Sequence, residues 1–138
     1  MTQSARSARS SERRAELVLE IVQRLSVLLA AGLCPAKAWA AVADEVHRLR
    51  DDRAARDVRA VTTAAALAAT EGADVARALR AGGPTWQPVA AIWSVATECG
   101  APLAATLRSS AGALRDAREI HDDVRVALAE PRSTSRLL

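Results

Sequence analysis

The chain has 138 residues, enough for one domain with a single hydrophobic core and too few for two of ordinary size. Half of its residues are hydrophobic, but only 2% are aromatic and 33 are alanine, a composition that favours closely packed helices and excludes sandwiches, barrels and doubly wound sheets. The 19 basic and 16 acidic residues leave a net charge of +3 and are interleaved almost everywhere, which is not the pattern of a nucleic-acid-binding protein.

The first predicted helix begins after a polar start. Residues 1–11 carry only Arg6 and Arg9 as charges and lack the apolar run of a signal peptide, so we expect a disordered tail. From Glu12 onward, apolar residues recur at three- and four-residue steps and predict a helix that Gly32 ends. These residues are Leu17, Ile21, Leu25, Leu28 and Leu29.

A second helix is predicted from Pro35, which suits the first turn, to about Arg48, with Trp39 on its apolar face. The charged stretch 47–59 has neither glycine nor proline. We expect a break there, with Asp51 or Asp52 as the cap of a third helix, and one continuous helix over 35–70 is the alternative.

The third helix is predicted over 53–70 and the short fourth over 74–79, before the loop at 82–84. Thr85 is the predicted cap of the fifth helix, which Gly100 ends. The sixth and longest helix opens at Pro102 and is predicted to stop at Pro131. Its apolar stripe consists of Leu103, Leu107, Ala111, Leu114, Ala117, His121, Val124 and Leu128.

Three glycines repeat one spacing. Gly32, Gly72 and Gly100 each precede an alanine by four positions and a large apolar residue by seven, which predicts a helix, a tight corner and a second helix, although helical periodicity alone generates such spacing. We therefore predict an all-α fold, a compact bundle of about six antiparallel helices joined by short glycine corners. The domain is expected to span 12–130.

No catalytic, cofactor or metal site is predicted. Asp44 and His47 have the spacing of one of the two carboxylate–histidine pairs of a di-iron site. The second pair is missing, because the residue three before His121 is Arg118. His121 is expected at the edge of the core. Cys34 and Cys99 follow no signal peptide and are expected to be free thiols that pack at the glycine corners.

The sixth predicted helix carries a candidate docking surface for a partner. Four arginines fall within about a third of its circumference, namely Arg108, Arg115, Arg118 and Arg125. The alternative is ordinary pairing along one solvated face, since Arg115 stands four before Glu119 and Arg118 four before Asp122.

Several of these segments together resemble a known family. The stretches 28–39, 72–75, 93–103 and 127–138 are similar to the type II secretion system F domain, in the form found in Tad (tight adherence, Flp pilus) platform proteins of high-GC Gram-positive bacteria. The resemblance covers roughly 17–138. Its corner residues are Gly32, Pro35, Trp39, Gly72, Glu98, Gly100, Pro102 and Leu103.

The resemblance implies a function that composition does not reach. It implies a cytoplasmic helical domain of an inner-membrane platform protein, not an enzyme, that couples a secretion ATPase to pilin assembly through protein–protein contacts. Its implied partners are the ATPase, pilin, and another platform protein or a second copy. Segment 131–138 is expected to lead toward membrane helices beyond Leu138, while the chain itself is expected to be soluble.

Two other classes of function remain open at this stage. A soluble helical nucleic-acid-binding regulator is suggested by the pI near 9.6 and the helix-corner-helix units. The helix after Gly72 carries only Arg77 and Arg80, and the helix after Gly100 is apolar as far as Arg108, so neither offers the polar side chains that read base edges. An enzyme would require a metal or cofactor to appear in the purified protein.

Overall fold

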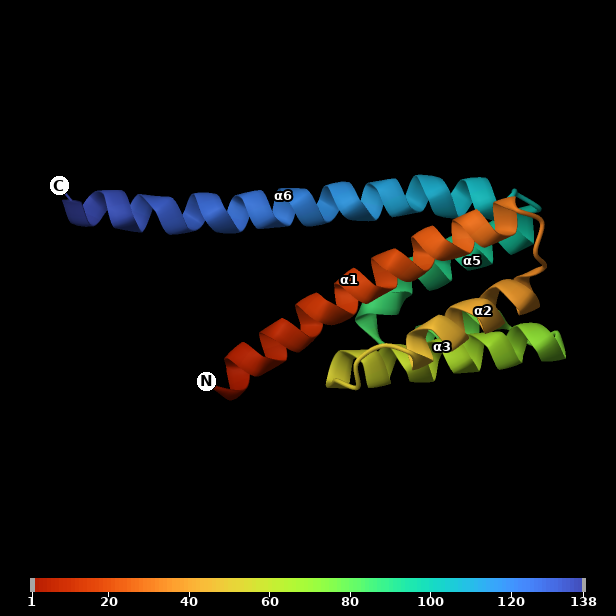
Figure 1. The fold of residues 1–138 in the computed structure, drawn as a ribbon. Coiled ribbons are helices and arrows are strands. Elements are labelled where there is room, and N and C mark those ends of the chain that lie inside the picture. Colours follow the sequence, from red (N-terminus) through yellow and green to blue (C-terminus); the bar gives the residue numbers. More distant parts are fainter. Residues whose placement is uncertain (1, 138) are drawn as a thin grey trace.

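The structure is a computed structural model that describes the backbone of residues 2–137 and the side chains of residues 2–128. Over that range the chain forms α-helices and one 3-10 turn, and no strand (Figure 1). The helices are α1 (Gln3–Ala30), α2 (Pro35–His47), α3 (Arg53–Glu71), α4 (Val75–Arg80), α5 (Gln87–Cys99) and α6 (Leu103–Leu137). The predicted all-α class with six helices is confirmed.

Helix α1 begins earlier than the sequence predicts. The segment 1–11 was expected to be disordered, but the helix already starts at Gln3, where the Thr2 hydroxyl accepts a hydrogen bond from the Ala5 N–H at 3.2 Å. The segment repeats serine, alanine and arginine; its alanines and arginines are good helix formers, and the cap satisfies one of the free N–H groups of the first turn. Local propensity and capping therefore override the absence of an apolar stripe.

Helices α2 and α3 are separate, as the charged stretch predicts, so the single helix over 35–70 is wrong. Asp52 caps α3, with its Oδ1 accepting from the Ala55 N–H at 2.8 Å. The fifth helix differs from its prediction. A 3-10 turn, η1 (Pro84–Trp86), precedes it, Gly83 stands at the start of that turn, and Thr85 caps nothing there.

The glycine corners have a common geometry. Gly72 and Gly100 stand just past α3 and α5 with φ of 71° and 68°, a left-handed conformation that residues with a Cβ rarely adopt. The next residue then donates its N–H to a carbonyl five positions back, Ala73 to Ala68 at 2.8 Å and Ala101 to Ala96 at 2.9 Å. The corner at Gly32 closes in the same way.

The core is built from tryptophan, leucine, valine and alanine. Trp39, Trp86 and Trp93 are all buried, and the Trp39 and Trp93 rings lie 5.5 Å apart between centroids. Leu25, Leu79 and Leu107 are fully buried around them. The small alanines Ala38, Ala55, Ala65 and Ala90 fill the remaining contacts between helix backbones.

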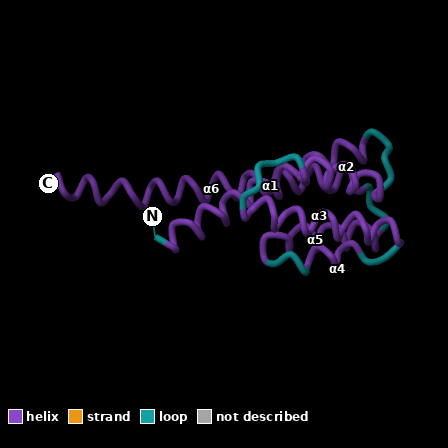
Figure 2. Tube along the Cα trace, turned by 60° about the horizontal axis from the view of Figure 1, so that its bottom comes forward, coloured by secondary structure: helices purple, strands orange, loops and turns teal. Residues whose placement is uncertain are grey.

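The helices run back and forth along one direction, and α1 and α6 extend beyond the rest (Figures 1 and 2). Helix α2 packs on α3, and α1 packs antiparallel to α6. Helix α1 also contacts α2 and α3. The N-terminal half of α1 and the C-terminal half of α6 project past the compact body at the same end of the molecule (Figure 1).

The sixth helix differs from its prediction at two points. It continues through Pro131 to Leu137, so the predicted stop is wrong. Proline removes one backbone hydrogen bond, but its fixed φ is compatible with a helix. The apolar stripe is also not a core stripe throughout, because Ala111 is the last buried residue among those of α6 whose side chains are described.

Candidate protein-interaction surface

Two of the four arginines predicted to form a docking surface bind α1 instead. Arg118 Nη2 lies 3.5 Å from Glu16 Oε1, and an Arg125 Nη1–H donates to the carboxylate of Glu12. Arg118 therefore turns toward α1 rather than toward Asp122 on its own helix. These two contacts join the middle of α6 to the first half of α1.

The contact with Arg125 perturbs the titration of Glu12. The hydrogen bond from Arg125 and its positive charge hold the pKa of Glu12 below its ordinary value of 4.5. Glu12 is thus ionised at neutral pH and remains an acceptor for the arginine. Because both side chains are about half exposed, water and salt screen this pair.

The other two predicted arginines make no contact with α1 of the kind that Arg118 and Arg125 make. Arg108 and Arg115 are exposed, and no ion pair joins either of them to a carboxylate in the part of the chain whose side chains are described. The predicted set of four is therefore divided between two that fix α6 and two that face solvent. Only Arg108 and Arg115 remain available to a partner.

Past Ala111, α6 presents an apolar stripe to solvent. Ile120, Val124 and Leu128 are 64%, 51% and 69% exposed. Their spacing of four places them along one side of the helix. An exposed stripe of large apolar side chains is typical of a surface that another chain covers. We refer to Ile120, Val124 and Leu128 as the α6 stripe.

Two hollows adjoin α1. One, of about 360 Å³, lies between α1 and α6 and is lined by Glu12, Leu114 and His121 among others. His121 is exposed there, so its expected place at the edge of the core is wrong, because the helix has left the core by that point. The other, of about 370 Å³, lies between α1 and α2, and the Arg24–Glu45 pair at 3.1 Å borders it.

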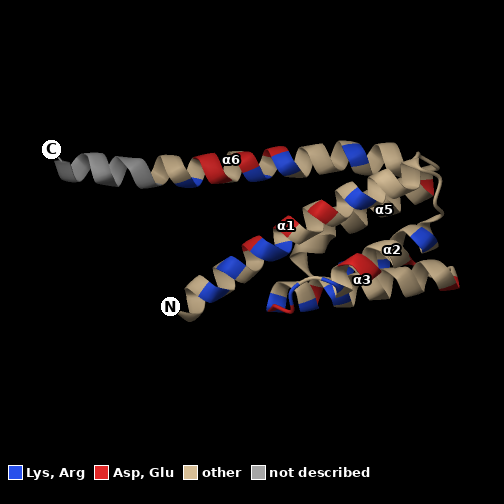
Figure 3. Ribbon diagram, in the orientation of Figure 1, with Lys and Arg blue, Asp and Glu red and all other residues tan. Residues whose placement is uncertain are grey.

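Arginine is concentrated where α1, the α2–α3 turn and the start of α3 meet (Figure 3). The sequence analysis does not predict this feature. We call it the arginine corner. It consists of Arg6, Arg9, Arg13, Arg14, Arg48, Arg50, Arg53, Arg56 and Arg59, together with Asp51, Asp52 and Asp57. Segments some forty residues apart supply it, so no single window of the sequence contains it.

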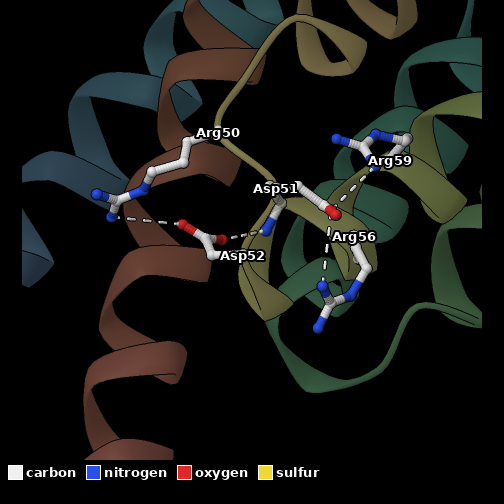
Figure 4. A network of polar contacts seen from close by, with 6 residues as sticks. Arg50, Asp51, Asp52, Arg56 and Arg59 are labelled. Carbon is white, nitrogen blue, oxygen red and sulfur yellow. Dashed lines mark hydrogen bonds and ion pairs between the residues drawn. The ribbon is translucent and has the colours of Figure 1, made fainter.

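Ion pairs assemble the arginine corner. Asp52 accepts from the Ala55 N–H and faces Arg50 at 3.9 Å, and Asp51 faces both Arg56 and Arg59 (Figure 4). Asp52 also faces Arg13 of α1 at 3.7 Å. Across the helices, Arg14 Nη2 lies 2.6 Å from Asp57 Oδ2. Asp51 and Asp52 thus each face two guanidinium groups, so positive charge is in excess in the arginine corner.

A regular spacing in the sequence could have indicated the arginine corner. Arg50, Arg53, Arg56 and Arg59 recur at intervals of three, and Arg6 and Arg9 repeat that interval. The interleaved aspartates hide the pattern in a count of charge along the chain. In the structure, Asp51 and Asp52 each face two arginines, so the arginines outnumber the carboxylates that pair with them.

The remaining predicted residues occupy helix ends and the core. Pro35 opens α2, Trp39 is buried against Trp93, and Pro102 and Leu103 open α6. Glu98 is exposed and accepts a hydrogen bond from the Ser94 hydroxyl at 3.3 Å. The corner residues Gly32, Gly72 and Gly100 stand in turns with positive φ, and Gly72 borders a hollow of about 510 Å³ that Pro35 and Trp93 also line.

Cysteine and histidine form no evident reactive arrangement. Cys34 and Cys99 are free and exposed, so their expected burial at the corners is wrong. Within residues 2–128, no three His, Cys, Asp or Glu side chains gather as a metal site would require. Asp44 and His47 are both exposed on α2.

None of the helices described combines the length and the apolar character needed to cross a membrane. The described residues form a helical bundle whose surface carries charged side chains and several exposed large apolar ones.

The comparisons with known proteins identify the family. The family described as type II secretion system (T2SS), protein F, matches residues 21–138, which is most of the chain. The chain belongs to this family. Its members are structural platform proteins of secretion and pilus systems, not enzymes, and associate with the inner membrane. They generally interact with a secretion ATPase and other platform components. No curated protein and no solved structure matches the chain.

Proposed function

We propose that the chain is the cytoplasmic domain of an inner-membrane platform protein of a Tad or type IV-like pilus, or of a type II secretion machine, and that it couples the secretion ATPase to pilin assembly through protein–protein contacts. The family match over residues 21–138 is the observation that carries this proposal. The continuous α6 supports it, since a 35-residue helix anchored at one end in the core transmits displacement along its axis.

The ATPase contact is proposed on the solvent side of α6. Arg108 and Arg115 are exposed there and free of ion pairs within the described part of the chain, whereas Arg118 and Arg125 are engaged with α1. The α6 stripe, further along the same helix, is the surface proposed for a second platform protein, either a copy of this chain or a relative. Separate residues of one helix would then serve the two partners.

Sedimentation velocity of the chain, alone and mixed with the secretion ATPase of its own system, tests this function. We expect a complex with the ATPase, and self-association of the chain as its concentration rises. The double substitution Arg108→Glu and Arg115→Glu should weaken the ATPase complex by tenfold or more, on the order of 1.4 kcal/mol.

The control is Lys37→Glu with Arg77→Glu, which makes the same change of charge at exposed positions near the starts of α2 and α4. It should leave the ATPase complex unchanged. Absence of any complex, with the isolated chain and with the chain in its membrane-embedded protein, would contradict the coupling role.

A further inference from the structure

The arginine corner lies at the end of the molecule toward which α6 runs. Arg125 contacts Glu12 on α1, and the adjacent Arg13 contacts Asp52 at the start of α3. The early part of α1 thus contacts α6 on one side and the start of α3 on another. Because α1 and α6 are antiparallel, the start of α1 and the end of α6 lie toward the same side of the molecule, where the two helices diverge (Figure 1).

Positive charge is concentrated at this end. The segments 2–14 and 48–59, which supply the arginine corner, contain nine arginines and four acidic residues (Glu12, Asp51, Asp52 and Asp57), whereas the rest of the chain contains ten basic and twelve acidic residues. The modest net charge of +3 therefore conceals a basic end and a weakly acidic remainder. Such a separation of charge orients a molecule in the field of a charged surface.

Several guanidinium groups of the arginine corner are available to a ligand. Arg6, Arg9, Arg48 and Arg53 are exposed, and none is ion-paired with a carboxylate of the described side chains. Arg13 and Arg14 on α1 pair with Asp52 and Asp57 and so join α1 to the start of α3. Three further arginines, Arg50, Arg56 and Arg59, pair with Asp51 or Asp52 within the α2–α3 turn and the start of α3. The structure therefore presents free arginines on a braced surface.

The early part of α1 extends this surface outward. At 100° per residue, Arg6, Arg9 and Arg13 fall within about 60° of one another around the helix. Arg13 faces the start of α3, so Arg6 and Arg9 continue the same face beyond it. Gln3 stands nine residues before Glu12, which carries this face about 14 Å further.

We propose that the arginine corner binds the anionic phospholipid surface of the membrane and so fixes the orientation of the domain upon it. This inference rests on the proposed function, which places the chain beside the inner membrane. Basic side chains near an anionic bilayer are attracted to it, and guanidinium groups hydrogen-bond to phosphate. A broad basic face formed from the ends of several elements, with no helix directing polar side chains into a groove, fits a lipid surface better than a duplex.

Vesicle co-sedimentation of the 138-residue chain tests this inference. We expect binding to vesicles containing phosphatidylglycerol, little binding to vesicles of phosphatidylcholine alone, and loss of binding as salt is raised, since the Debye length falls from about 10 Å at 0.1 M to about 3 Å at 1 M. The double substitution Arg9→Glu and Arg53→Glu should lower the partition coefficient by about 25-fold or more.

These substitutions are chosen to spare the fold. Both positions are exposed, and Arg53 is the first residue of α3, where glutamate interacts favourably with the helix dipole. Far-ultraviolet circular dichroism checks that helicity is retained, and Arg9→Gln with Arg53→Gln should give an intermediate loss of binding. The matched control, Lys37→Glu with Arg77→Glu, changes the charge equally outside the arginine corner and should retain most of the binding.

Three results would overturn the inference. They are equal binding to neutral and anionic vesicles, an equal loss of binding in the control variant, and salt-sensitive binding of duplex DNA through Arg9 and Arg53 without binding to anionic vesicles. Lipid binding and the ATPase complex are measured separately. Failure on vesicles with an intact ATPase complex rejects only this inference, whereas vesicle binding without an ATPase complex rejects only the coupling role.

Discussion

At Gly82 a hydrogen atom is the only side chain that fits. A Cβ there would lie 2.5 Å from Val61 Cγ2 and 2.7 Å from Trp86 Cδ1, both in the core. The repeated spacing in the sequence singles out Gly32, Gly72 and Gly100 instead. Glycine is required at position 82 because side chains distant in the sequence pack closely against it. No local pattern in the sequence predicts that contact.

We expect Gly82→Ala to destabilise the fold by about 1–3 kcal/mol, because Val61 and Trp86 must move to admit the methyl group. Gly112→Ala is the matched control. A Cβ at Gly112 meets nothing within 4 Å, and alanine is the better helix former, so this change should stabilise α6 by about 0.5–1 kcal/mol. Urea unfolding followed by circular dichroism compares the two, and equal effects would refute the packing argument.

Asp52 combines a helix cap with ion pairs. The hydrogen bond from the Ala55 N–H holds the pKa of Asp52 below its usual value of 3.8, with burial opposing the shift and Arg13 and Arg50 adding to it. We expect Asp52→Ala to cost about 1 kcal/mol of unfolding free energy, and Asp52→Asn to cost less because the amide oxygen still accepts the cap bond. The same urea titration measures both, and the explanation fails if asparagine costs as much as alanine.

At the scale of the element, the two parts of the continuous helix α6 have different surroundings. Up to Ala111 it is a core helix, and beyond that point it is held to α1 mainly by arginine–glutamate pairs. The apolar periodicity is the same in both parts, so the sequence predicted a single core stripe. Periodicity identifies the face of a helix, but whether a neighbour covers that face depends on how far the other helices reach.

The pair between Glu12 and Arg125 predicts an acid-sensitive contact. The pKa of Glu12 is depressed in the folded chain, so its stabilising contribution is present above the ordinary value of 4.5 and is lost as the pH falls through the lower, folded value. Nuclear magnetic resonance of the backbone amides of 118–128 should show a transition below pH 4.5 that Glu12→Gln abolishes. A transition at or above 4.5, or one that survives the substitution, would contradict this assignment.

At the scale of the whole molecule, the sequence predicts what is local. The glycine corners, the cap at Asp52 and the buried tryptophans follow from residue type and spacing, and so the fold class and most helix bounds were accessible. The early start of α1 was not, because it depends on capping by Thr2 rather than on an apolar stripe. The arginine corner could not be predicted from the sequence either, because it forms only when α1 packs against α3.

The tryptophans give the molecule an unusual optical character. The chain has no tyrosine or phenylalanine, and its three indoles are all buried, two of them with ring centroids 5.5 Å apart and ring planes inclined by 55°. Its near-ultraviolet absorption and emission therefore come from the core, and the two neighbouring indoles are close enough for exciton coupling in circular dichroism. The exciton signal should disappear when the packing of the core is lost. It should not respond to conformational change or binding at the start of α1 or at the projecting end of α6.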